Sequence, residues 1–131
     1  MKFFHRSNCM RSLFVALSLS QSWALATDVP RLPVSEVSPL LRQALQSSDG
    51  TANGILVGEL AQAIGLRFQS PSPIHIDVRT ERRYVQAGCA RLHVLFRHDG
   101  VLLPGAADAR GQSIEFGIDY CLTGEPPGSR Q

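Results

Sequence analysis

Two cysteines, Cys89 and Cys121, stand at the ends of two runs of alternating apolar and polar residues, and this pair most constrains how the chain can fold. A period of two is typical of a β-strand that buries one face. Cys89 shares its parity with the polar positions of the run Ala90–Phe96, and Cys121 does the same in the run Ile114–Tyr120. Both thiols are therefore predicted on the polar side of one sheet, where a disulfide could join neighbouring strands.

The first 26 residues predict export. Three basic residues precede an apolar stretch from Leu13 to Leu19, and small residues follow up to Ala26. This layout is typical of a secretory signal peptide, and the apolar stretch is shorter than the roughly 20 residues that a membrane span needs. We expect residues 1–26 to be cleaved near Ala26, leaving a periplasmic or secreted protein with no membrane span; an uncleaved anchor or a buried helix is the alternative.

Export also decides how the cysteines are interpreted. Cys9 leaves with the signal peptide, so two cysteines remain in an oxidising compartment, and a single disulfide between Cys89 and Cys121 is predicted. The two positions are 32 apart, and closing a loop of that length stabilises a domain by roughly 3 to 4 kcal/mol. A redox-active or metal-binding thiol pair is the alternative, but neither a CxxC motif nor a histidine next to either cysteine supplies the further ligands that a metal site would need.

The mature chain would be a single small domain of nearly neutral charge. Cleavage leaves 105 of the 131 residues, and the net charge falls from +2 to −1 because the signal peptide carries three basic residues and no acidic one. A domain without a net positive charge does not attract the phosphate backbone of nucleic acid, so we expect no nucleic-acid partner.

Two helices are predicted before the strands. Residues 27–37 contain two prolines and indicate an extended leader. Ser38-Pro39 is typical of a helix start, and apolar residues recur at helical spacing until Asp49-Gly50. A second helix is predicted within residues 51–68, with Gly65 placed to end it.

The remaining chain predicts three strands, which begin near Ile74, Ala90 and Ile114. The fold class is therefore α+β: two N-terminal helices packed on the apolar face of a three-stranded antiparallel sheet with one disulfide. This domain covers residues 38–122, and residues 123–131 are predicted to be a disordered tail. An all-β domain preceded by a loosely attached helical segment is the alternative.

The polar positions of the strands form a candidate surface site. Two histidines and a carboxylate on one face could bind zinc or serve as acid and base, which would make a small metal-binding protein or hydrolase. Further charged residues on the same face are instead typical of a solvated sheet with cross-strand charge pairs, so no catalytic residue, metal ion or cofactor is predicted. The predicted polar face comprises His75, Asp77, Arg79, Arg91, His93 and Asp119, of which His75, Asp77 and His93 would form the alternative site. Glu81, Arg83 and Glu115 are assigned to it by the same parity.

The segments "RRYVQAGCARLHV" and "IEFGIDYCLTGEPP" resemble small exported proteins encoded in bacterial integrative conjugative elements. The resemblance covers the last 50 residues or so of the chain and implies a periplasmic accessory of a DNA-transfer apparatus, a type IV secretion system. No nucleophile elbow or phosphate-binding loop argues for an enzyme. We expect a non-enzymatic binding or structural accessory whose partner is another envelope protein, met through the charged face or a strand edge. An inhibitor or immunity-type protein is a further alternative.

Overall fold

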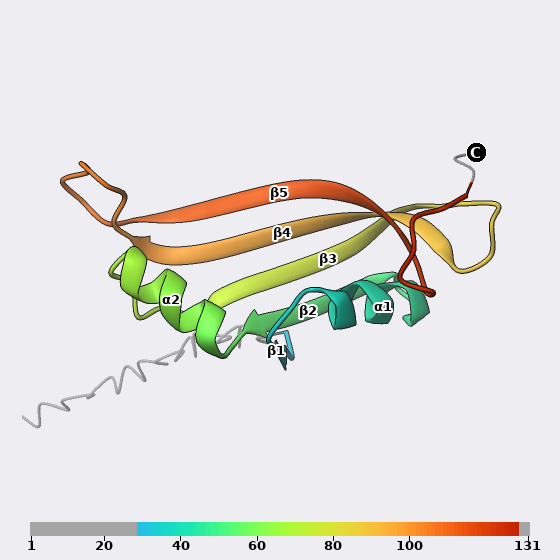
Figure 1. Cartoon of the computed structure of the whole chain (residues 1–131), viewed down its shortest axis with the longest axis horizontal. Coiled ribbons are helices and arrows are strands. Elements are labelled where there is room, and N and C mark those ends of the chain that lie inside the picture. Colours follow the sequence, from blue (N-terminus) through green and yellow to red (C-terminus); the bar gives the residue numbers. More distant parts are fainter. Residues whose placement is uncertain (1–28, 129–131) are drawn as a thin grey trace, which may run out of the picture.

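The computed structural model describes residues 29–128, so the predicted signal peptide and the last three residues of the predicted tail lie outside the described part. Within that part, five strands form one mixed sheet in chain order, and two helices accompany it (Figure 1). β1 runs parallel to β2, and every other neighbouring pair is antiparallel. The elements are β1 (Leu32–Val34), α1 (Ser38–Gln46), β2 (Thr51–Leu56), α2 (Glu59–Arg67), β3 (Ile74–Arg83), β4 (Cys89–Val101) and β5 (Arg110–Cys121).

The α+β fold and the disulfide are confirmed, but the prediction of a three-stranded antiparallel sheet is wrong, because β1 and β2 extend it to five strands. β2 occupies a segment that was assigned to the second helix. Its alternate residues Ala52, Gly54 and Leu56 are buried, and the strand pairs along its whole length with β3. The small side chains at two of these three positions hide the alternation from a sequence pattern.

β2 needs a residue without a side chain at Gly54, because Leu40 of α1 packs directly against the backbone there. A Cβ atom added at Gly54 would lie 2.6 Å from Cδ1 of Leu40 and 3.0 Å from the carbonyl oxygen of Leu32. Leu40 is fully buried in α1, so α1 approaches the backbone of β2 where the side chain is missing. The chain from β1 through α1 to β2 is thus a compact βαβ unit.

The second helix is shorter than predicted because of Gly58. This residue has a positive φ of +89°, which glycine adopts without strain, and α2 begins directly after it at Glu59. Gly65 was predicted to end the helix but lies inside it, and the helix ends at Arg67.

β1 lies in the segment that was predicted to be an extended leader. Leu32, Pro33 and Val34 pair with Gly54, Ile55 and Leu56. A strand containing proline is tolerated here because β1 is an edge strand, where a missing backbone donor leaves no neighbour unpaired.

α1 forms the helical side of the core. It starts at Ser38 as predicted, although the capping position is Val37, which offers no side-chain hydrogen bond. Its buried residues Leu40, Leu41, Ala44 and Leu45 pack on the sheet, whose buried residues complete the core: Val34, Ala52, Leu56, Ile74, Ile76, Val78, Ala90, Leu92, Val94 and Tyr120.

α2 covers little of the sheet. None of its residues is buried, and only Ala61 and Ile64 pack against the core. The prediction that two helices cover the apolar face of the sheet is therefore wrong for the part of that face near β5. β5, at the opposite edge from β1, lies away from α1 (Figure 1). Its apolar residues Ile114 and Phe116 are 68% and 43% exposed. Neither helix within residues 29–128 is long and apolar enough to span a membrane.

Candidate functional site

The six residues of the predicted polar face all lie on the side of the sheet that faces away from α1. Their register positions alternate with buried core residues, and cross-strand partners share a face. Their surroundings divide the face into three groups, one around Asp77, one around His93, and one around Asp119 beside the disulfide.

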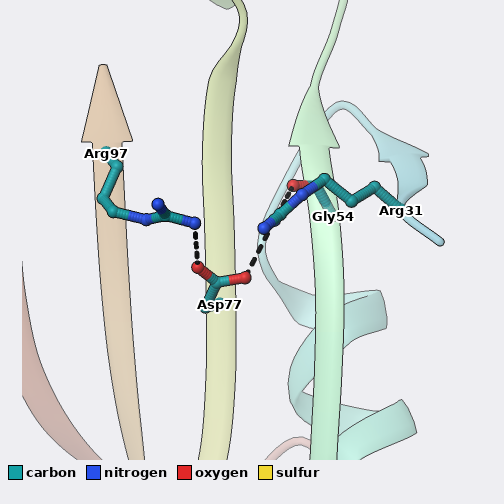
Figure 2. A network of polar contacts seen from close by, with 4 residues as sticks. All are labelled: Arg31, Gly54, Asp77 and Arg97. Atoms are coloured by element: carbon teal, nitrogen blue, oxygen red, sulfur yellow. Dashed lines mark hydrogen bonds and ion pairs between the residues drawn. The ribbon is translucent and has the colours of Figure 1, made fainter. Parts of the chain in front are cut away.

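Asp77 on β3 is held between two arginines (Figure 2). Nη1 of Arg31, just before β1, lies 2.8 Å from Oδ1, and Nη2 of Arg97 on β4 lies 2.8 Å from Oδ2. Arg31 also donates a hydrogen bond of 3.3 Å to the carbonyl of Gly54 on β2. One carboxylate thereby ties β1, β3 and β4 together.

These contacts fix the charge state of Asp77. Burial raises the pKa of the carboxyl, but the hydrogen bonds and positive charges of Arg31 and Arg97 outweigh it, and the pKa lies below its ordinary value of 3.8. A carboxylate with both oxygens occupied by guanidinium groups is a structural anion, poorly suited to accept a proton or bind a metal.

The two histidines of the alternative site are not brought together. Nε2 of His93 lies 3.1 Å from Glu115 Oε2 on β5. His93 stands opposite Arg79, which is four residues, roughly 13 Å, from His75 along β3. Among residues 29–128, no group of three or more histidine, cysteine, aspartate or glutamate side chains could hold a metal ion.

The third group surrounds the disulfide. Cys89 and Cys121 face each other in register, as their parity predicted, but each is only 3% exposed and they cluster with Tyr84. The Tyr84 hydroxyl donates a hydrogen bond to Asp119, and Nη1 of Arg91 lies 3.2 Å from the same carboxylate.

A bulge in β3 explains why Tyr84 lies here. Thr80 pairs with Leu92 and Arg82 with Arg91, so Glu81 is an extra residue in the strand. Parity reverses after it. Arg82 and Tyr84 therefore lie on the polar face, while Arg83 turns to the other side and donates a hydrogen bond of 3.2 Å to the carbonyl of Leu45 in α1. The assignment of Arg83 to the polar face is wrong for this reason.

The outer edge of β5, with which no other strand of residues 29–128 pairs, is a feature that the sequence did not reveal. The N–H of Tyr84 donates to the carbonyl of Cys89, and the N–H of Cys89 donates to Gln86, so both backbone groups of Cys89 point toward β3. Cys89 and Cys121 are therefore a pair without mutual backbone hydrogen bonds, and the backbone groups of Cys121 point away from β4. Because the direction of the backbone groups alternates along a strand, the N–H and C=O groups of every second residue before Cys121 also point away from β4: Ser113, Glu115, Gly117 and Asp119.

Beside this edge lies an apolar strip on the α1 side of the sheet. We define it as Phe96, Ile114, Phe116 and Ile118. The rings of Phe96 and Phe116 stack with their centroids 6.1 Å apart, and Phe96 and Ile118 are only half-buried. Ile114 and Phe116 are both exposed, so neither helix of residues 29–128 covers these two side chains.

Edge strands are usually protected against pairing with other chains by proline, by charged side chains, lysine above all, or by a bulge. The two acidic residues of β5, Glu115 and Asp119, each contact a basic side chain of β4. From Gln112 to Cys121, β5 has no proline or lysine, and its register with β4 is continuous. The edge and the apolar strip together form a surface suited to adding a strand, and we call the two together the β5 surface. Comparisons of the chain with protein-family models, with curated proteins and with solved structures found no match, so the β5 surface is interpreted from its own chemistry.

Proposed function

We propose that this chain is a non-enzymatic accessory protein of the cell envelope, periplasmic or secreted, that acts by binding a strand of another envelope protein along the β5 surface. The single observation that carries the proposal is that a long edge with outward-pointing backbone groups lies directly beside exposed apolar side chains. An added strand would satisfy the backbone groups and cover the apolar side chains at once.

The charged face is a weaker candidate for the same role. The carboxylates of Asp77, Glu115 and Asp119 each lie within 3.2 Å of a basic side chain of the same sheet. A partner would have to break these pairs before forming its own, and exposed ion pairs contribute little to affinity. The apolar strip requires no such exchange.

The envelope location is supported by the signal-like start of the sequence and by the disulfide, which forms and persists in oxidising compartments. The resemblance of the C-terminal half to proteins of conjugative elements makes the partner a component of a type IV secretion apparatus. That part of the proposal depends on the resemblance alone.

The experiment compares two substitutions at Glu115. Glu115→Pro removes an N–H that points to the open edge, whereas Glu115→Ala removes the same side chain and keeps that N–H. Mature protein carrying each change, and the unchanged protein, would be used to capture partners from periplasmic extract under mild crosslinking. We expect the unchanged protein and Glu115→Ala to recover the same envelope protein, and Glu115→Pro to lose it.

Equal recovery by Glu115→Pro, or no envelope protein recovered by any of the three, would contradict the proposal. Tight one-to-one recovery of a single enzyme would favour the inhibitor or immunity-type alternative. Circular dichroism of the three proteins would confirm that the sheet is retained in each.

A further inference from the structure

We infer that, in the absence of a partner, the β5 surface is covered by a second copy of this chain, which a partner strand must displace. The inference rests on the proposed function in that both place the interaction on β5. The two copies would pair β5 with β5 in antiparallel orientation, with Phe116 opposite Phe116 of the other copy.

The register follows from the direction of the backbone groups. When two residues stand opposite each other in antiparallel strands, the backbone groups of both point toward the other strand, or those of both point away from it. When two identical strands pair about a two-fold axis, one residue must therefore stand opposite itself. The candidates near the centre of β5 are Glu115, Phe116 and Gly117.

Charge and packing choose among them. A centre at Glu115 places that carboxylate against its own copy, and a centre at Gly117 places Glu115 against Asp119; both put like charges directly opposite. A centre at Phe116 places Ile114 opposite Ile118, so all three β5 residues of the apolar strip meet apolar partners. It also gives nearly the longest possible overlap, because Phe116 lies at the middle of the strand.

This register also creates charge complementarity on the polar face. Glu115 of one copy stands opposite Gly117 of the other. The guanidinium of Arg91 lies directly over Gly117, since a Cβ atom added there would be 2.5 Å from its Nη2. Within each copy Glu115 contacts His93 and Arg91 contacts Asp119, but the side chains of Glu115 and Arg91 are 68% and 40% exposed, so each can also reach across. Each copy thus offers an arginine to the other's carboxylate, and the pair occurs twice by symmetry.

Such an interface is expected to form and dissociate reversibly. It consists of one strand from each copy and one row of apolar side chains, which is small compared with the interface of a permanent dimer. A partner strand that makes the same backbone hydrogen bonds and better apolar contacts would replace the second copy.

Disulfide trapping tests the register. Cysteines opposite each other at a pair without backbone hydrogen bonds are close enough to bond, as Cys89 and Cys121 are, with Cα atoms 4.0 Å apart. We expect Phe116→Cys to form a disulfide-linked dimer on mild oxidation. Ile114→Cys and Ile118→Cys should each stay unlinked alone and should link to each other when mixed. Linking of Ile114→Cys or Ile118→Cys to itself, with none at Phe116→Cys, would overturn the register.

Analytical ultracentrifugation of the unaltered mature chain tests the association without any change in the strip. We expect a monomer–dimer equilibrium that Glu115→Pro weakens about 10- to 100-fold, because one donor is lost from each copy, while Glu115→Gln weakens it less. A protein that stays monomeric up to about 1 mM, or a dimer that Glu115→Pro leaves unchanged, would overturn the inference. A monomer that still loses its envelope partner through Glu115→Pro would leave the proposed function standing, whereas a dimer that captures no partner would contradict only the proposed function.

Discussion

Arg31 and Asp77 are 46 residues apart in the chain, and a hydrogen bond of 2.8 Å joins the guanidinium of the first to the carboxylate of the second across β2. Arg97 completes the contact from the other side, also at 2.8 Å. Because β1 has only three residues, this ion pair is a main tether of the N-terminal edge to the sheet.

Asp77→Asn is expected to lower the free energy of unfolding by about 2 kcal/mol, because two charge-assisted hydrogen bonds lose their ionised acceptor and Arg31 is left largely buried. Urea denaturation would measure the loss. Glu81→Gln is the matched control, since Glu81 lies 3.8 Å from an exposed Arg79 and should change stability by less than about 0.5 kcal/mol. Equal effects of the two substitutions would contradict this role for Asp77.

The same carboxylate should make stability depend on pH. The pKa of Asp77 in the folded protein lies below its ordinary value of 3.8, so its contribution is fully present above about pH 4 and is lost as the pH falls through the lower folded-state pKa. The difference in unfolding free energy between the unaltered protein and Asp77→Asn should therefore shrink on acidification below about pH 4. A difference that is constant from pH 6 to pH 2 would refute it.

Gly54→Ala is expected to destabilise the protein by about 1 to 3 kcal/mol, because the new methyl group would overlap the buried side chain of Leu40. Combining it with Leu40→Ala should cost less than the sum of the two single changes, since the second removes the atoms that clash. Thermal and urea unfolding of the four proteins would give the coupling energy. Strict additivity would show that α1 does not press on β2 at this glycine.

Replacing both disulfide cysteines by alanine should cost roughly 3 to 4 kcal/mol, as expected for a closed loop of 32 residues. Each cysteine is 3% exposed, so a reductant should reach the bond only when the strand ends open. Reduction under native conditions should therefore be slow and should accelerate in moderate urea. A rate independent of urea would mean that the bond is accessible in the folded state.

Thr80→Val is expected to be neutral or to stabilise the protein by about 1 kcal/mol. Oγ1 of Thr80 is buried and makes no hydrogen bond with any described residue, and valine replaces it by a methyl group of nearly the same shape. Loss of more than about 1 kcal/mol in urea denaturation would show that the hydroxyl has a polar partner. Ser47→Ala serves as contrast, because its hydroxyl bonds the carbonyl of Thr51 at 2.9 Å and its removal should destabilise.

The sequence predicted the parts of this fold that alternation and covalent chemistry determine. β3, β4 and β5 alternate over many residues, and the cysteine pair sets the register of the last two. β2 was missed because Ala52 and Gly54 are poor markers of a buried face, and the strand runs on toward α2 with only Gly58 between. β1 was missed because three residues with a proline do not make a pattern. The bulge at Glu81 has no local signal, so Arg83 was assigned to the wrong side.

The site was predictable to a smaller degree. Parity placed Asp77 and His93 on one face, but the arginines that hold Asp77 come from a leader and from β4, which only tertiary structure brings together. The apolar residues of β5 were correctly assigned to a strand face. How far α1 extends over that face depends on helix length and position, which the residues of β5 do not encode, and this is why the open strip was missed.

The disulfide closes a covalent ring that contains β4, β5 and the exposed connection from Leu103 to Ala107. A protease that cuts this connection would leave two fragments that cannot diffuse apart. The nicked molecule would migrate as one species until it is reduced and as two afterwards, so the protein can lose the continuity of its backbone at this point and still keep all of its strands in place.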